Sequence, residues 1–541
     1  CLMIDRPIPK LQIIAKIQYY IDEGALDDAI KFTIENQESL AGDDNFYVEF
    51  GSILMQLGYP ARASEFFLEA YKINPDSDDI TQQLVGSFDA AEQPQLATKI
   101  LWNVWERHPF EIEILSQLET RYAADGDFDT AREMSSLAAV VKGENINSRP
   151  PRIPACDPTK IRSIAIVAPF PRPRNWKIAR AIQSFGAEVI FIHHKRFQPQ
   201  AEGPYTASYS YGSLLELRDA IRQVQAEHKP ELFHVFCDGY GYLDAVILMN
   251  MVSEPVIWDY YDMVNVSYTL ESTPEYDLSS VLELWCMKHA DGVCARNLEI
   301  QVAKRRDYYQ RNGNIIFYPD YCHGNVNRRQ KFGDHDGRLH VFISDPIRDP
   351  GLDKSHPNSL RPIIEHLVQL DIIQLYISPH HNQGTKWAKI YPGYVKLEEE
   401  YDNLTIQQPK SEGKYLEIIS QVDVMIGGIC RVNPGNMNEN KITSDHIRNY
   451  FPGKFSDFLD SDVMFILPKY EPLEFCSWLV KRLDVGLVPT PEEIYGQQFW
   501  RQLHKKIRSE PINYSEARNF WSIERQAGRL HDFYRNIVQH S

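Results

Sequence analysis

Hydrophobic and polar positions follow two different patterns along this chain of 541 residues. Near the N-terminus, apolar residues recur every three to four positions, as on one face of an amphipathic helix. This spacing predicts helices over residues 24–36, 58–73, 91–107 and 126–141. After residue 160, short apolar runs alternate with helical stretches. The first pattern predicts an all-helical region, and the second pattern predicts parallel sheets covered by helices on both faces.

The helical region repeats itself with a period of 34 residues. One small residue recurs at this interval, at Ala29, Ala63, Ala97 and Ala131. Three positions later the chain has a large apolar residue, namely Phe32, Phe66, Ile100 and Met134. Five positions before the alanines stand Gly24, Gly58, Glu92 and Gly126. A small residue lets two helices approach closely, so this pattern indicates packed helical hairpins.

The pattern resembles the tetratricopeptide repeat, which has the same period, a G-x-x-x-x-A motif opening its second helix, and a proline such as Pro75 or Pro109 after it. The resemblance implies a stack of about three and a half hairpins over residues 8–142. Two interpretations are open. The groove of the stack holds a protein acceptor or partner, or the stack is a rigid spacer or dimerisation element.

The rest of the chain divides at changes of pattern. Residues 143–160 hold four prolines and no periodicity, which is typical of a linker. We expect a first α/β domain over 161–337, a second over 338–500, and helices over 501–541 that pack back on the core. Predicted strands include 163–167, 188–192, 232–236, 256–259 and 292–295, then 339–344, 373–378, 422–427 and 463–467. Residues 169–175 read as a loop.

Composition and charge restrict the function. With 57 Lys and Arg against 74 Asp and Glu, the net charge of -17 argues against nucleic acid as a partner. No apolar run reaches the ~18 residues of a membrane span. The eight cysteines are scattered without metal-ligand spacing, so we expect reduced thiols and no metal site. Reduced thiols in turn indicate a cytoplasmic protein. The chain begins without Met, so we expect it to be a fragment. No G-x-G-x-x-G or P-loop occurs, so we expect no cofactor.

Several motifs of the α/β region resemble those of GT-B glycosyltransferases. In the second domain, VDVMIG at 422–427 and PGKFSDFLDSDV at 452–463 are similar to a strand and helix of the family's donor half. In the first domain the similar stretches are FGAEV at 185–189, LFHV at 232–235, WDYYD at 258–262 and HADGV at 289–293. The resemblance implies two Rossmann-like, doubly wound domains that bind a nucleotide sugar between them.

The resemblance also implies donor-binding residues. Lys454, at a predicted helix start, would contact the diphosphate, and Asp457 would contact a ribose hydroxyl. Arg348 and Lys354 follow the first strand of the second domain, where loops carry ligands in such sheets. The alternative for each of these four residues is that it is a solvated charge on the protein surface and binds no ligand. Asp462 and Asn449 depart from the family pattern, which leaves retention, inversion and loss of activity open.

Polar residues after the strands of the first domain are candidates for the acceptor side. Asp238 and Asp262 are our preferred general bases for deprotonating an acceptor. Asp259, His234 and Tyr240 are further acceptor-side candidates, with a satisfied core histidine as the alternative for His234 and simple packing for the tyrosine.

Together these features predict a metal-independent glycosyltransferase that transfers a sugar from a nucleotide sugar to a protein or glycan acceptor. The helical repeat would dock the acceptor or a protein partner. One alternative is a non-catalytic scaffold that binds a partner protein and at most a sugar nucleotide. Another is an epimerase with the same two-sheet plan.

Overall fold

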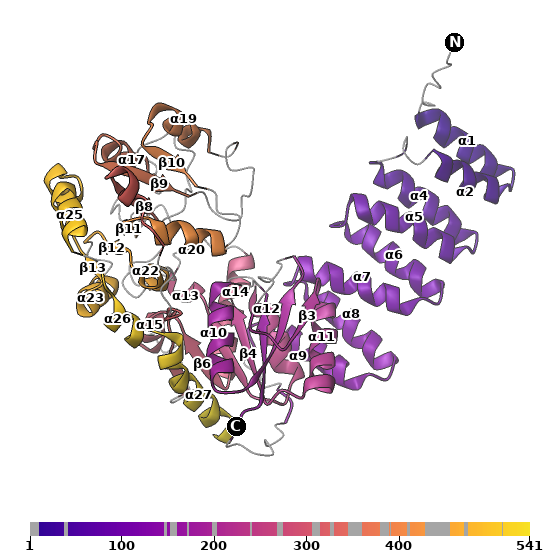
Figure 1. The fold of residues 1–541 in the computed structure, drawn as a ribbon. Coiled ribbons are helices and arrows are strands. Elements are labelled where there is room, and N and C mark those ends of the chain that lie inside the picture. The colour runs from indigo at the N-terminus through magenta and orange to yellow at the C-terminus, as the bar shows by residue number, and fades with distance from the viewer. Residues whose placement is uncertain are drawn as a thin grey trace, which may run out of the picture. The chain divides into compact units, whose positions relative to one another are not determined.

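The computed structural model describes most of the chain and divides it into two compact units, residues 1–138 and 139–541. We refer to them as the repeat unit and the α/β unit (Figure 1). The described residues are 10–36, 40, 42–144, 149–151, 160–169, 172–196, 203–237, 241–267, 274–305, 314–324, 329–344, 360–378, 389, 391–407, 412–427, 455–469, 474–510 and 512–540.

The repeat unit is built from pairs of antiparallel helices, as predicted. The first helix of each pair is α1 (Lys10–Asp22), α4 (Asp44–Gln56), α6 (Asp78–Ala90) or α8 (Ile112–Ala124). The second is α2 (Leu26–Glu35), α5 (Pro60–Ile73), α7 (Pro94–Arg107) or α9 (Phe128–Val141). Successive pairs begin 34 residues apart. The described residues thus form four hairpins rather than three and a half.

The residues that repeat in the sequence occupy equivalent places in these hairpins. All four repeated alanines are buried between helices. Gly24, Gly58 and Gly126 have positive φ angles of 74°, 83° and 81° at the turn between the paired helices. Glu92 takes the same place with φ 59°, a conformation that a side chain with a Cβ disfavours. The turn geometry therefore persists where the glycine does not.

The α/β unit begins with a seven-stranded parallel sheet, the first sheet. Its strands are β1 (Ser163–Ala168), β2 (Glu188–His194), β3 (Ala207–Tyr211), β4 (Leu232–Cys237), β5 (Val256–Tyr260), β6 (Gly292–Ala295) and β7 (Ile315–Phe317). They lie in the order β3-β2-β1-β4-β5-β6-β7. The chain therefore reverses its direction of growth between β1 and β4, which is the switch point of a doubly wound sheet.

Helices connect these strands and cover the sheet. They are α10 (Pro173–Ser184), α11 (Leu214–His228), α12 (Tyr242–Met251), α13 (Val264–Ser267), α14 (Pro274–His289) and α15 (Glu299–Arg305). The strands β1, β4 and β5 are buried at every residue, as expected for a sheet covered on both faces.

The second sheet repeats this plan with six parallel strands. They are β8 (Leu339–Ile343), β9 (Ile373–Ile377), β10 (Leu404–Ile406), β11 (Val424–Ile426), β12 (Met464–Ile466) and β13 (Gly486–Leu487), in the order β10-β9-β8-β11-β12-β13. The accompanying helices are α16 (Gly333–Asp336), α17 (Arg361–Leu367), α19 (Pro392–Glu400), α20 (Glu412–Gln421), α22 (Phe455–Ser461) and α23 (Glu474–Leu483).

The C-terminal helices join the two sheets into one unit. They are α24 (Pro491–Ile494), α25 (Gln497–Ser509), α26 (Ser515–Phe520) and α27 (Ile523–His540). Trp500 and Leu503 of α25 pack in the core of the second sheet. The chain then returns, and α27 packs against α10 of the first sheet (Figure 1).

Two local details differ from the sequence prediction. The edge strand β3 was not predicted, because its ASYSY sequence is short and largely polar, with alternating partly exposed side chains. Residues 169–175 were expected to form a loop, but α10 begins at Pro173, since proline is well tolerated in the first turn of a helix. This early start places Arg174 on the helix. The fold class itself is confirmed: helix pairs precede two doubly wound parallel sheets.

Candidate functional site

The polar residues that converge in the α/β unit lie at the carboxyl ends of β4 and β5 and at the start of α10. This is the edge at which open parallel sheets bind ligands. The backbone N–H of Arg172 donates to Oδ1 of Asn175 at 2.5 Å, which secures the first turn of α10. The same turn carries Arg174 and the next turn carries Lys177, and both side chains are buried.

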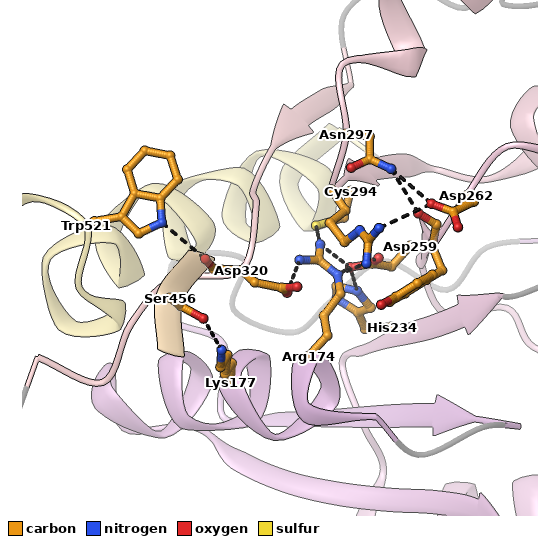
Figure 2. Close-up of polar contacts among 12 residues, drawn as sticks. Arg174, Lys177, His234, Asp259, Asp262, Cys294, Asn297, Asp320, Ser456 and Trp521 are labelled. Atoms are coloured by element: carbon orange, nitrogen blue, oxygen red, sulfur yellow. Dashed lines mark hydrogen bonds and ion pairs between the residues drawn. The ribbon is translucent and has the colours of Figure 1, made fainter. Parts of the chain in front are cut away.

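Arg174 is the centre of a buried charge network (Figure 2). Its Nε and Nη2 donate to the two carboxylate oxygens of Asp259 at 2.9 and 2.8 Å. Its Nη1 donates to Asp320 at 3.1 Å. Burial alone would raise the pKa of Asp259, but the adjacent Arg174 holds that pKa below its ordinary value. A paired guanidinium and carboxylate can stay ionised in the core only because each satisfies the other.

His234 on β4 completes the network from the other side. Its Nε2 lies 3.1 Å from Asp259, and its Nδ1 lies 2.6 Å from the hydroxyl of Tyr534 on α27. Burial lowers the pKa of the imidazole, so the neutral ring donates to the carboxylate and accepts from the tyrosine. His234 is fully buried and both of its ring nitrogens have partners, as in the core-histidine alternative, and an acceptor-side role for it stays a prediction.

His234, Asp259 and Cys294 are also close enough to act as a metal-ligand set, with one potential ligand atom from each lying within 4.8 Å of the others. The guanidinium of Arg174 already lies among them, since it chelates Asp259 and approaches the Cys294 sulfur at 3.5 Å. Burial raises the pKa of the Cys294 thiol, which disfavours the thiolate that binds metals. These residues therefore do not fit a metal ion.

Tyr261, just beyond β5, lies between two arginines. The guanidinium carbon of Arg172 is 4.5 Å from the ring centroid, and that of Arg296 is 3.6 Å from it. Such contacts hold guanidinium groups flat against the aromatic face. Three arginines, counting Arg174, are thus gathered around the ends of β5 and β6 and the start of α10.

Asp262 follows in the same segment and is partly exposed. Its Oδ1 accepts from Arg296 at 3.2 Å and from the side-chain amide of Asn297 at 3.1 Å. These two donors fix the orientation of the carboxylate (Figure 2).

A small hollow of about 10 Å³ opens beside these groups. Its lining combines the start of α10 with the ends of β4 and β5: Arg172, Arg174, Asn175, Phe236, Cys237, Asp259 and Tyr261. A space of this size is near the minimum that holds one water molecule. The described side chains that line this hollow therefore leave room for about one water molecule.

A second polar group links the two sheets. Lys177 on α10 donates to the hydroxyl of Ser456 and lies 3.6 Å from the carboxylate of Asp457, both on α22 (Figure 2). One turn later, Asp460 accepts from the backbone N–H groups of His323 and Gly324 at 2.8 and 3.2 Å. Burial raises the pKa of Asp460 to about 7. The helix α22, which carries Asp457, therefore lies against α10 of the first sheet.

The structure brings together only some of the predicted residues. Asp259 and His234 share one network, Asp262 lies close to it in the chain, and Asp457 lies at the contact between the sheets. The remaining candidates lie outside the described residues, namely Asp238, Tyr240, Arg348, Lys354 and Lys454. Their roles stay predictions.

Sequence reasoning missed Arg172, Arg174, Lys177 and Arg296. The first three lie between positions 172 and 177, shortly after the first strand, in RPRNWK, so a basic segment beyond a strand end was a usable signal. Arg296 also directly follows a strand. Nothing in the sequence showed with which acidic residues these cations would form ion pairs.

Comparison with known proteins gives only structural likenesses. No protein-family model and no curated protein matches the chain. Among solved structures it is similar to the O-GlcNAc transferase of Thermobaculum terrenum, with 11% identity and a TM-score of 0.44 over 98% of this chain and 97% of that one. It is also similar to the UDP-GlcNAc 2-epimerase of Methanocaldococcus jannaschii (12% identity, TM-score 0.39, 70% of this chain and 100% of that one).

A putative UDP-N-acetylglucosamine 2-epimerase from Listeria monocytogenes is similar at 9% identity and a TM-score of 0.42, over 70% of this chain and 98% of that one. Likenesses at this level identify no activity. The fold class rests instead on the two strand orders and the returning C-terminal helix. The α/β unit has a GT-B-like fold. No described helix combines the length and apolar character that a membrane crossing requires.

Proposed function

We propose that this protein is a metal-independent glycosyltransferase that moves a sugar from a nucleotide sugar to a protein or glycan acceptor. The observation that carries the proposal is the pairing of two doubly wound sheets with cationic residues at the carboxyl edge of the first. Ligands of such sheets bind at this edge, beside the switch point between β1 and β4.

Breakage of the glycosidic bond leaves negative charge on a diphosphate, and fixed cations would stabilise it. We propose Lys454, Arg348 and Lys354 as the donor-side cations, following the motif resemblance. Asp457 would contact the ribose. Its carboxylate faces Lys177, so nucleotide binding would compete with this contact or share it.

A general base must accept a proton from the acceptor. Asp262 is suited to this role because Arg296 and Asn297 orient its carboxylate while leaving it partly exposed. Asp238 is the other candidate and follows β4 in the chain. Asp259 is a weaker candidate, because Arg174 and His234 already occupy both of its carboxylate oxygens.

The first test is a thermal-shift panel of UDP-, GDP-, ADP- and CMP-sugars, followed by hydrolysis and transfer assays with the donor that raises the midpoint. The Lys454→Ala variant should lose at least ~100-fold in transfer, the usual order for one transition-state cation. Lys481→Ala, at an exposed lysine in the last turn of α23, is the matched control and should retain activity. Unchanged hydrolysis and transfer in Lys454→Ala would refute the assigned role.

The second test separates the two bases. Asp262→Asn and Asp238→Asn should each leave the donor-induced thermal shift intact, since neither would bind the nucleotide. The true base variant should lose transfer by about 100-fold or more. If both variants transfer at the wild-type rate, neither aspartate is the base.

A non-catalytic scaffold is the second candidate function. It is favoured by the internal pairing of Asp259 and His234 and by the small size of the hollow beside them. A scaffold predicts no turnover with any donor, and the absence of any thermal shift in the panel would favour it over the glycosyltransferase.

A further inference from the structure

Negative charge is concentrated in one part of the chain. Residues 1–138 contain 25 Asp and Glu but 10 Lys and Arg, a net charge of -15. The remaining 403 residues contain 49 acidic and 47 basic residues, a net charge of -2. Even if every basic side chain of the repeat unit were paired internally, 15 carboxylates would remain without a cation from that unit. The repeat unit therefore attracts cations, and the α/β unit is close to neutral.

Exposed apolar side chains are concentrated in the same unit. Of ten large hydrophobic residues that are exposed in the described chain, seven belong to the repeat unit. They are Tyr19, Ile34, Leu57, Tyr59, Ile73, Leu96 and Phe128. Phe128 is 70% exposed and Tyr59 is 50% exposed. Exposed apolar residues mark an interaction surface when they lie together rather than scattered singly, so their positions on the unit decide.

Four of these residues lie along one edge of the hairpin stack. Tyr59 directly precedes α5, Leu96 is in the first turn of α7, and Phe128 begins α9. Leu57 ends the helix before Tyr59. With the 34-residue period, Leu96 and Phe128 correspond to positions 62 and 60 of the second hairpin, so all four residues lie near the same turn of successive hairpins, along one edge of the stack. We call this edge, where each first helix turns into its second, the turn edge.

The turn edge is also acidic. Glu23, Glu92 and Asp125 are exposed at equivalent or adjacent positions in the turns of the first, third and fourth hairpins. The nearest arginines already have carboxylate partners within the unit: Arg62 with Glu65 at 3.1 Å, Arg121 with Asp89 at 2.5 Å, and Arg132 with Asp129. A row of apolar side chains therefore lies within a negatively charged border.

We propose that the turn edge binds a basic, amphipathic polypeptide segment, with Tyr59, Leu96 and Phe128 as its apolar contacts and the turn carboxylates as its ionic contacts. The surface combines the two features that a lysine- or arginine-rich helix with one apolar face would match. A second copy of this chain fits less well, because its own turn edge carries the same sign of charge. The proposal does not depend on the glycosyltransferase assignment.

The test measures binding of a fluorescently labelled 18-residue lysine/leucine peptide, with its leucines on one helical face, to the full chain by fluorescence anisotropy. A lysine/serine peptide of equal charge is the probe for charge alone. The chain should bind the lysine/leucine peptide at least about tenfold more tightly, because apolar contacts supply part of the affinity. Equal affinity for the two peptides, or no binding of the first, would overturn the proposal.

Two variants and two controls localise the binding. Tyr59→Ser/Leu96→Ser/Phe128→Ser and Glu23→Lys/Glu92→Lys/Asp125→Lys should each weaken binding about tenfold or more. Glu35→Lys/Glu49→Lys/Glu113→Lys makes the same charge change at exposed positions away from the turn edge. This control and Trp478→Ser, at an exposed residue of the α/β unit, should change the affinity less than about twofold.

Helicity and thermal midpoints of all variants confirm that they fold. If the charge control weakens binding as much as the turn-edge reversal, the peptide recognises overall charge and the proposal fails. Light scattering adds a further outcome. A wild-type dimer that the apolar variant dissociates would show that the edge binds a second copy, and this too would overturn the proposal.

Discussion

The repeat unit and the α/β unit bury different kinds of polar group. Among the described residues, the buried polar side chains of the repeat unit are all hydroxyls, such as Thr33, Ser87 and Thr130. The α/β unit buries complete charges, including Arg174, Asp259 and Arg296. These hydroxyls of the repeat unit bond to nearby groups of their own chain segment: Thr33 and Ser87 donate to carbonyls of the preceding helical turn, and Thr130 donates to the carboxylate of Asp127. Buried charges in the α/β unit join elements that are far apart in the chain.

This difference follows from how each unit brings its parts together. Each hairpin of the stack contacts its neighbours in sequence, so apolar helix faces suffice and the charges can stay in water. The two sheets must instead position strands and helices that are up to 300 residues apart, as the contact between His234 and Tyr534 shows. Directional ionic contacts there specify which segments meet, provided every charge has a partner.

The largest expected effect tests the buried network. Asp259→Ala removes the bidentate partner of Arg174 and leaves Asp320 as the one carboxylate partner of that guanidinium among the described residues. We expect a loss of about 3–5 kcal/mol in the free energy of unfolding, measured by urea denaturation of the full chain.

The matched variant in the repeat unit is Asp76→Ala, which removes an exposed carboxylate 3.6 Å from Arg107. An exposed pair contributes about 0–1 kcal/mol, so this change should be small. Similar losses in the two variants would contradict the contrast between the units.

A pH dependence provides the next test. Burial raises the pKa of Asp460 from its ordinary 3.8 to about 7, while Lys177 opposes this shift and Asp457 adds to it. Between about pH 4 and pH 7 the unfolded chain therefore ionises first, and the folded state loses stability as the pH rises. Asp460→Asn should flatten this decrease in the urea midpoint. Part of the decrease would remain in this variant, because burial also raises the pKa of Glu283 to about 7.

Asp371→Asn, at a side chain that is 83% exposed, serves as the control and should leave the pH profile unchanged. A wild-type profile that rises between pH 4.5 and 7, with Asp460→Asn parallel to it, would show that Asp460 does not contribute as proposed.

The smallest effect concerns the repeat unit. Glu92 has a positive φ of 59° where the equivalent residues are glycines. Glu92→Gly should relieve the strain of the left-handed conformation, which exceeds the entropic cost of glycine, and stabilise the unit by about 0.5–1 kcal/mol. Native-state hydrogen exchange of α6 and α7 measures this gain. Glu113→Gly, inside the first turn of α8, should destabilise instead.

The two units also differ in how far their sequence predicted their structure. In the repeat unit, spacing located every second helix, because helix periodicity is a local property, whereas the positive φ angles of the recurring glycines were found only in the structure. In the α/β unit the buried apolar strands were located equally well, but the polar edge strand β3 was missed. The motif resemblance also predicted the GT-B-like order of the sheets.

The candidate site was predicted only in part. Asp259, His234 and Asp262 were singled out from the sequence, Asp259 and Asp262 at or just beyond the end of β5 and His234 within β4. Their partners were not, since Arg174 is 85 residues from Asp259 and Tyr534 is 300 residues from His234. A carboxylate that could be a base in an open cleft becomes half of an ion pair once a guanidinium lies against it.

The sequence by itself determined which segments are helices and strands, that the chain begins with repeated hairpins, and that two doubly wound sheets follow. Those features depend on neighbours within a few turns or one repeat. Only the tertiary structure decided which charges are buried together and which strand-end residues keep access to solvent. That outcome depends on burial and on distances between segments remote in the chain, and both set the charge state and availability of each group.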